Sequence, residues 1–198
     1  KIGFFLTNKK KPPHSINLNY TNPPKVFVIG NVIVGGVGKT PTTICLIQEL
    51  LKEGVNPAVI SRGYKSLIDG EKKNSQIVNL KKANLNYREF GDEPCLIADT
   101  GVPVCVGNRF EAMGIIKSNF PKTDVILLDD GLQQSKIPTN RKILVIDERL
   151  FGNEKVLPYG PLREPIPFDH EIDGVILNNS VENLVFDDIS NKAYFKKK

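Results

Sequence analysis

The chain has 198 residues, of which 40% are hydrophobic and 25% are charged, and its formal net charge is +5. This length suits one globular domain with a full core, and no apolar run approaches the roughly 18 residues needed to span a bilayer. The cysteines, Cys45, Cys95 and Cys105, are odd in number and form no C-x-x-C pair, and no signal-peptide pattern is present. The composition therefore argues against a membrane-spanning or disulfide-bonded secreted protein and predicts reduced thiols in an intracellular one.

The positive charge is concentrated in two short lysine tracts, 9–11 and 196–198. These six lysines leave a net charge of −1 on the rest of the chain. Such tracts are either solvated tails or contacts with an anionic membrane surface, where each lysine contributes about 1 kcal/mol. No aromatic residues alternate with the lysines to stack on bases, so a nucleic-acid partner is not expected. Nothing in the sequence points to an obligate protein partner.

Apolar runs and helical stretches alternate along the chain. Continuous β-branched runs favour buried parallel strands, and an α/β alternation favours helices on both faces of such a sheet. In chain order, the sequence predicts a strand at 25–30, a helix from Pro41 to about Glu53, a strand at 56–61, a helix from Gly91 to about Asp99, a strand at 103–107, a helix at 108–120, and strands at 124–130, 141–147 and 174–179. The pattern predicts a doubly wound α/β sheet with its ligand site at the carboxyl ends of the strands.

Two segments are expected to lie outside this alternation. Residues 1–24 contain two proline pairs and several asparagines and predict an irregular, basic lead-in to a single domain over 25–198. Residues 65–88 are polar and lysine-rich and predict a mobile excursion. Within the helix that begins near Gly91, Asp92 is the expected N-cap.

The segment with the clearest chemistry is the glycine-rich stretch that follows the first strand. Gly35, Gly36, Val37, Gly38, Lys39 and Thr40 (35–40, here called the phosphate loop) stand between a predicted strand and a predicted helix. Glycines allow backbone N–H groups to surround a phosphate, and the helix N-terminus adds a positive dipole. Lys39 can reach the β- and γ-phosphates, and the Thr40 hydroxyl can bind Mg²⁺. The alternative is a glycine-rich turn between strand and helix in which Lys39 and Thr40 have no role in binding phosphate.

The phosphate loop departs from the common G-x-x-x-x-G-K-[ST] pattern, because Ile33 stands where that pattern has its first glycine. The glycines form the compressed pattern G-G-x-G-K-T, which occurs in another branch of phosphate-binding-loop proteins, usually with a lysine where this chain has Val34. The context nevertheless predicts a P-loop NTPase-like domain that binds a nucleoside triphosphate.

Paired acids end the predicted strand at 124–130. Asp129 and Asp130 follow four apolar residues, and a carboxylate at such a strand tip holds Mg²⁺ directly or through water. Adjacent acids on a strand point in different directions, so we expect Asp129 and Asp130 to have different roles. The alternative is a pair of solvated acids before a turn at Gly131.

Other polar residues at the carboxyl ends of strands allow more than one interpretation. Asp92 is either a helix cap or a carboxylate that faces the γ-phosphate and accepts the proton of an attacking hydroxyl. Arg62 and Arg109 are either phosphate clamps or surface charges. The rigid, proline-rich segment at 157–167 presents Arg163 and Glu164.

These motifs together resemble the tetraacyldisaccharide 4′-kinases, which phosphorylate the lipid A precursor. The match begins with Val28-Ile-Gly-Asn31 and Val34-Gly-Gly-Val-Gly-Lys-Thr-Pro41 and covers residues 28–165. It continues in order through Ser61-Arg-Gly-Tyr64, Gly91-Asp-Glu-Pro94, Pro103-Val-Cys-Val-Gly107 with Arg109, Asp129-Asp-Gly-Leu-Gln133, Phe151-Gly-Asn153 and Leu157-Pro-Tyr-Gly-Pro-Leu-Arg-Glu-Pro165.

The resemblance implies transfer of the γ-phosphoryl group of ATP to the 4′-hydroxyl of the tetraacyldisaccharide-1-phosphate glycolipid. It implies a peripheral location on the cytoplasmic face of the bacterial inner membrane, or a soluble cytoplasmic one if the membrane-binding N-terminus is lost. The implied site residues are Lys39 on the phosphates, Thr40, Asp129 and Asp130 on Mg²⁺, Asp92 as general base, Arg163 and Glu164 near the reacting centre, and Arg62, Tyr64 and Arg109 lining the site.

The chain also departs from the family pattern. Gln134 stands where the family usually has a histidine, and Ile2–Leu6 is too short for the family's N-terminal membrane helix. The family continues beyond the position of Lys198 and supplies an Asp-His pair there, for which Asp169-His170 lies too early. A truncated or fragmentary kinase is therefore expected, with a non-catalytic nucleotide-binding remnant or a nucleotide-dependent switch or maturation protein as alternatives.

Overall fold

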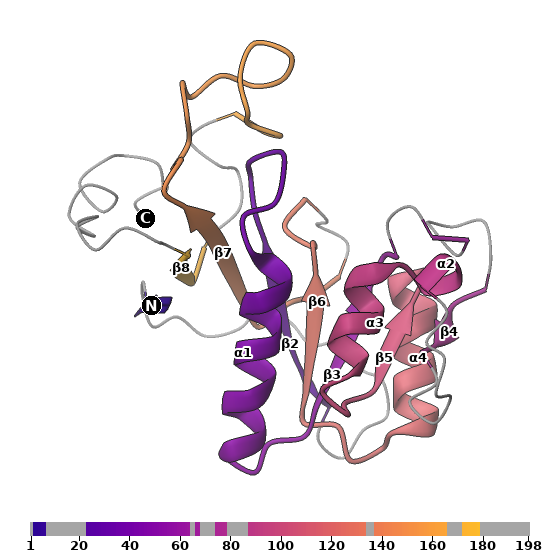
Figure 1. Ribbon diagram of the computed structural model, residues 1–198. Coiled ribbons are helices and arrows are strands. Elements are labelled where there is room, and N and C mark those ends of the chain that lie inside the picture. The colour runs from indigo at the N-terminus through magenta and orange to yellow at the C-terminus, as the bar shows by residue number, and fades with distance from the viewer. Residues whose placement is uncertain are drawn as a thin grey trace.

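The computed structural model describes residues 2–6, 23–63, 66–67, 74–78, 87–133, 137–165 and 172–178 (Figure 1). The two lysine tracts, Tyr64, Gln134 and the Asp169-His170 pair lie outside these described residues. None of the helices in the described part of the chain combines the length and the apolar character that crossing a bilayer requires.

Strands and helices alternate through most of the described chain, as predicted. In order they are β1 Ile2–Leu6, β2 Lys25–Gly30, α1 Lys39–Lys52, β3 Pro57–Ser61, β4 Gln76–Ile77, α2 Tyr87–Phe90, α3 Asp92–Ala98, β5 Val104–Val106, α4 Arg109–Asn119, β6 Val125–Asp129, β7 Arg141–Asp147 and β8 Gly174–Asn178.

The strands form one mostly parallel sheet in the order β1-β8-β7-β2-β6-β3-β5-β4. The six central strands, from β8 to β5, are parallel to their neighbours, and only the short outer strands β1 and β4 pair antiparallel. β3 and β6 are buried along their whole length, which explains their unbroken apolar sequences. The predicted α/β fold class is confirmed.

Helices cover both faces of this sheet. The chain moves in one direction across the sheet from β2 to β3 and β5 and then returns to β6, β7 and β8. Because crossovers between parallel strands are right-handed, α1 and α3 lie on one face, where they contact each other, and α4 covers β3 and β5 from the other. All the carboxyl ends of the central strands therefore point to one edge, at the top of Figure 1.

Three local predictions are wrong. Ile2–Leu6 is a strand paired with β8, not irregular structure, because the proline pairs that favoured a loop begin only at Pro12. The excursion at 65–88 contains β4, which pairs with β5. Asp92 is the first residue of α3 and not its N-cap; that position belongs to Gly91, whose φ of 92° suits glycine.

Packing around Gly30 ties the end of β2 to the residues that follow β6. A Cβ atom at Gly30 would lie 2.7 Å from Cγ of the buried Leu132.

The Gly30→Ala variant should therefore force Leu132 to move and should lose roughly 1–3 kcal/mol of unfolding free energy in a urea titration. Gly114→Ala in α4 is the matched control, because nothing lies within 4 Å of its added methyl group. It should gain about 0.5–1 kcal/mol from helix propensity, and equal stability of the two variants would contradict this packing.

Candidate active site

The phosphate loop joins the end of β2 to the start of α1. Gly35 and Gly38 have positive φ angles of 103° and 78°, and Gly38 is the N-cap of α1. Only glycine adopts such angles at little cost, which is why the sequence needs glycine at these points. The N–H groups of Gly35, Gly36, Val37 and Gly38 have no hydrogen-bond acceptor within the described residues. The loop therefore holds a set of backbone donors available to an anion.

Lys39 extends from the first turn of α1 toward the acids at the end of β6. Its ammonium Nζ donates to Asn31 Oδ1 at 3.0 Å and lies 3.5 Å from Asp130 Oδ1. Asn31 is fully buried, and its side-chain amide also donates to the carbonyl of Ile33. The lysine is thus oriented by a fixed amide on one side and by a carboxylate on the other. Thr40, beside it, is also buried.

The acids at the end of β6, Asp129 and the following Asp130, have different surroundings. Asp130 has a positive φ of 53° and a partly exposed side chain, which receives two hydrogen bonds of 3.1 Å from Nη1 of Arg163. Asp129 is only 2% exposed; its Oδ2 accepts a long 3.5 Å bond from the Ser61 hydroxyl, and its Oδ1 has no partner among the described atoms.

Burial controls the protonation of Asp129. It raises the pKa of this carboxyl to about 7, with a further contribution from the negative charge of Glu93, while Lys39 acts in the opposite direction. Acids with such a pKa and with an oxygen that has no partner among the described atoms cluster at functional sites, which makes Asp129 a candidate site residue.

Arg109 supports the backbone under the two acids. Its Nη2 donates to the carbonyls of Asp129 at 2.9 Å and Asp130 at 2.7 Å. The residue is 6% exposed, so the surface-charge interpretation is wrong. Burial lowers the pKa of Arg109, against the opposing fields of Asp130 and Asp129. The resemblance to the kinase family implied that Arg109 lines the site, but not that it would bind the main chain of the two acids.

The proline-rich segment folds back onto the loop after β2. The N–H of Val34 donates to the Pro161 carbonyl, and the N–H of Arg163 donates to the Val32 carbonyl, both at 2.8 Å. These two bonds bring Arg163 to Asp130. Glu164 is linked to the same region through Gln133, whose Nε2 donates to Glu164 Oε1 and to the Asn31 carbonyl, each at 3.1 Å.

Asp92 and Arg62 lie at the edge of this network, and both residues are exposed. Asp92 is the first residue of α3 and Glu93 is the second. The influence of Glu93 on the pKa of Asp129 places the start of α3 within electrostatic range of the buried acid. Arg62 is similarly within electrostatic range of Arg109.

The structure adds site residues that the sequence reasoning did not single out. Asn31 and Gln133 belong to the matched motifs, whose pattern by itself indicates no role for them, although an asparagine directly after the loop-bearing strand is a usable signal. Arg149 and Asn178 bind carbonyls of the phosphate loop. They are more than a hundred residues from it in sequence, so no local pattern indicated them.

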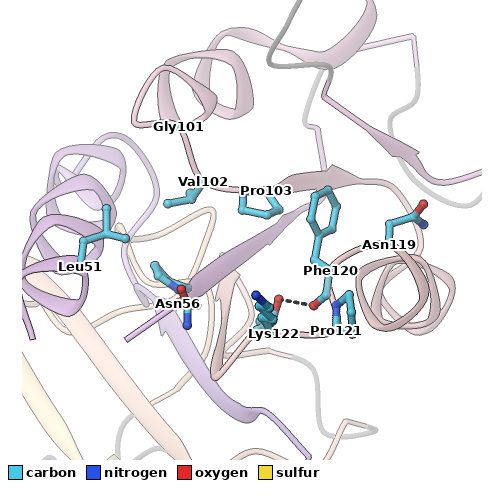
Figure 2. A pocket seen from close by; sticks show the side chains of 11 residues that line it. Leu51, Asn56, Gly101, Val102, Pro103, Asn119, Phe120, Pro121 and Lys122 are labelled. Atoms are coloured by element: carbon cyan, nitrogen blue, oxygen red, sulfur yellow. Dashed lines mark hydrogen bonds between the residues drawn. The ribbon is translucent and has the colours of Figure 1, made fainter. Parts of the chain in front are cut away.

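A cavity of about 410 Å³ lies at the opposite edge of the sheet (Figure 2). Residues at or next to the amino ends of β3 and β5, the end of α1 and the loop after α4 surround it. They include Leu51, Asn56, Val102, Pro103, Phe120 and Lys122. None of the candidate site residues lines this cavity, so it is separate from the phosphate loop.

Comparisons with known proteins agree with this geometry. The profile of the family described as tetraacyldisaccharide-1-P 4′-kinase matches residues 6–195. The tetraacyldisaccharide 4′-kinase of Francisella tularensis subsp. novicida is 39% identical over 177 residues, which cover 87% of this chain and 53% of that protein. The enzyme of the same name from Francisella tularensis subsp. holarctica is 38% identical over an equal span.

A solved structure supports the same assignment. The Aquifex aeolicus protein LpxK, described as an "apo" form in complex with ATP, is 33% identical with a TM-score of 0.61, over 75% of this chain and 46% of that one. The chain spans about half the length of the curated relatives it matches. With a family profile that covers nearly all of its residues, the chain belongs to the tetraacyldisaccharide-1-P 4′-kinase family.

Proposed function

We propose that this chain binds ATP and takes part in transferring its γ-phosphoryl group to the 4′-hydroxyl of the tetraacyldisaccharide-1-phosphate precursor of lipid A. The observation that carries the proposal is the position of Lys39, held by Asn31 and Asp130 beside a loop whose N–H donors have no acceptor in the described chain. The relatives' names supply the acceptor, and the ATP of the Aquifex aeolicus structure supplies the donor. The comparisons do not favour the alternatives of a non-catalytic remnant or a nucleotide-dependent switch.

Phosphoryl transfer needs positioning and charge neutralisation more than covalent chemistry. The N–H groups of the phosphate loop would bind the β- and γ-phosphates, and Lys39 would exchange its contact with Asp130 for one with these phosphates. Arg163, held on Asp130 by two hydrogen bonds, would then be a cation on the acceptor side of the transferred group. Glu164 and Arg62 would complete the polar lining.

The residues present fit a Mg²⁺ ion bound together with the nucleotide. Asp129 Oδ1 is buried without a partner among the described atoms. Thr40 is part of the phosphate loop, and Asp130 Oδ1 lies 3.5 Å from Nζ of Lys39 in that loop. Mg²⁺ in such sites takes one or two carboxylates and completes its shell with phosphate oxygens and water. The described residues contain no group of three or more His, Cys, Asp or Glu side chains that could hold a metal ion, so the proposed ion would take its further ligands from ATP and water. The ion would neutralise charge on the transferred phosphoryl group.

Asp92 is the proposed general base. It is exposed at the start of α3, on the same edge of the sheet as the phosphate loop, where a carboxylate can accept a proton from the sugar hydroxyl. The general base must reach the hydroxyl group of the sugar, whereas the acid that binds Mg²⁺ must keep a fixed position. The exposed Asp92 and the buried Asp129 divide these two tasks.

The acylated acceptor and its membrane suit the surface beside the site. Apolar side chains are exposed on the segments around the phosphate loop, with Val34 42%, Leu157 57% and Tyr159 80% exposed. They would face acyl chains or lipid while the sugar enters the site. A peripheral position on the cytoplasmic face of the inner membrane would combine this surface with lysine contacts to anionic lipid.

Replacement of Lys39 by alanine tests the phosphate site. The Lys39→Ala variant should lose detectable binding of a non-hydrolysable ATP analogue with Mg²⁺ in calorimetric titration, because the lysine is the cation that α1 brings to the phosphates. Lys52→Ala, at the far end of α1 in an exposed pair with Glu49, is the control and should bind like the unmodified chain. Equal binding of the ATP analogue by both variants would contradict the proposed role of Lys39.

The role of Asp92 is tested by separating chemistry from binding. Asp92→Asn should lower phosphoryl transfer to the tetraacyl disaccharide about 100-fold or more and leave the affinity for the ATP analogue within about two-fold. A radiolabelled-ATP assay and calorimetry measure the two effects. Asp99→Asn, at the other end of α3, should change neither, and parallel losses of transfer and affinity in Asp92→Asn would argue against a base.

The raised pKa of Asp129 predicts an unusual dependence of stability on pH. The folded chain holds a proton on Asp129 up to about pH 7, whereas the unfolded chain releases it near pH 4. The contribution of Asp129 to the stability of the nucleotide-free protein should therefore fall as pH rises from about 4 to 7. Asp129→Asn should unfold at a higher temperature than the unmodified chain at pH 8, with the difference shrinking toward pH 4.

An acid of opposite behaviour provides the control for this experiment. Hydrogen bonds from the backbone and side chain of Asn56 lower the pKa of the exposed Asp124. Asp124→Asn should be less stable than the unmodified chain at neutral pH, and this deficit should disappear in acid. A pH-independent difference between Asp129→Asn and the unmodified chain would contradict the assigned titration.

A further inference from the structure

Two consecutive carbonyls of the phosphate loop accept hydrogen bonds from side chains at or just beyond the ends of two neighbouring strands. Arg149 Nη2 donates to the Gly36 carbonyl at 2.9 Å, and Asn178 Nδ2 donates to the Val37 carbonyl at 3.2 Å. Arg149 lies two residues beyond the end of β7, and Asn178 ends β8, opposite Asp147 in the parallel register. Two adjacent strand ends thus reach two adjacent peptide groups of the loop.

Arg149 is itself held rigidly by the last residue of β7. The Asp147 carboxylate accepts from Arg149 Nε at 3.1 and 2.9 Å, from Nη2 at 2.5 Å, and from the Arg149 backbone N–H at 3.1 Å. Asp147 is buried, so it cannot turn freely toward water. A planar guanidinium bound along one side by a carboxylate has a fixed orientation, and this orientation presents the remaining hydrogen of Nη2 to Gly36.

The position of Asn178 requires glycine in the loop. A Cβ atom at Gly38 would collide with the Asn178 amide nitrogen. Gly38 also has the positive φ of the helix N-cap. The same residue therefore admits the amide of Asn178 on one side and turns the chain into α1 on the other.

The geometry of the peptide group connects these bonds to phosphate binding. In a trans peptide, the carbonyl of one residue and the N–H of the next lie in one plane and point in opposite directions. Binding of the Gly36 carbonyl therefore directs the Val37 N–H to the other side of the loop, and binding of the Val37 carbonyl does the same for Gly38. Both N–H groups have no acceptor within the described residues.

We infer that Arg149 and Asn178 are positioning residues for the nucleotide phosphates, with Arg149 orienting the Val37 N–H and Asn178 orienting the Gly38 N–H. The inference rests on the proposed binding of ATP. Glycine-rich backbone samples many conformations, and an unpinned carbonyl that turned toward the phosphates would repel them. Arg149 and Asn178 remove this alternative before the nucleotide arrives, which is a gain in preorganisation.

The first test compares a ligand that has phosphates with one that lacks them. Calorimetric titrations would use a non-hydrolysable ATP analogue with Mg²⁺, and adenosine, on the 198-residue chain. Arg149→Ala and Asn178→Leu should each weaken analogue binding about ten-fold and leave adenosine binding unchanged. Arg141→Ala is the control, because Arg141 begins the same strand β7 and pairs with Asp173 at the far edge of the sheet. It should bind both ligands normally.

The second test follows individual N–H groups by nuclear magnetic resonance. In the unmodified chain, addition of the analogue should move the amide protons of Val37 and Gly38 downfield as they donate to phosphate. Arg149→Ala should lose the shift at Val37 and keep that at Gly38, and Asn178→Leu should do the reverse. A purely structural role would weaken both shifts together in either variant, and that result would overturn the inference.

A conservative variant keeps the test decisive if Arg149→Ala does not fold. Arg149→Lys preserves the charge and the alkyl stem but lacks the planar fork needed to bind Asp147 and Gly36 together. It should also lose the Val37 shift, and retention of that shift would refute the role of Arg149. Failure of the unmodified chain to bind the analogue would instead refute the proposed function, whereas normal binding by all variants would refute only this inference.

Discussion

The parallel pairing of β2 with β6 is the contact on which the rest of the site depends. It places Ile29 opposite Asp129, so the chain that leaves β2 as the phosphate loop begins beside the chain that leaves β6 with two acids. Gly30 packs directly on Leu132, and the N–H of Gly131 donates to the Ile29 carbonyl at 3.4 Å. Lys39 can reach Asp130 only because these two strand ends are held at this separation.

The cationic side chains of the site are shared unequally between the two acids, and this leaves Asp129 able to bind a ligand. Lys39 and Arg163 both contact Asp130, whereas the buried Asp129 receives a long bond from Ser61. Arg109 uses Nη2 on backbone carbonyls and not on these carboxylates. A buried carboxyl group with so little hydrogen bonding prefers to hold a proton. A cation that displaced this proton would bind the carboxylate of Asp129. The proposed binding of Mg²⁺ with ATP follows from this electrostatic arrangement.

Residues at or just beyond the ends of β7 and β8 bind the phosphate loop, and the proline-rich segment binds the residues that lead into it. β8 and the residues just after β7 supply Asn178 and Arg149 to the carbonyls of the loop. Hydrogen bonds between the loop after β2 and residues 161–163 bring Arg163 to the acids. The phosphate loop and the residues just before it are thus fixed by groups from three separate parts of the chain, which compensates for the flexibility of the loop's glycines.

The sequence alone determined those features whose causes are local. Continuous apolar runs predicted β6 and β7 within one residue of their bounds, because a buried strand needs apolar residues. Glycines before Lys-Thr predicted a phosphate loop, because positive φ angles favour glycine. The tertiary structure decided what depends on pairing between distant segments. Ile2–Leu6 forms a strand only because it pairs with β8. Arg109 is buried and binds the backbone of the two acids only because the fold places the end of β6 beside it. Arg149 and Asn178 reach the loop only through the strand order, since contacts between residues more than a hundred positions apart are set by how the strands pair and not by residue spacing.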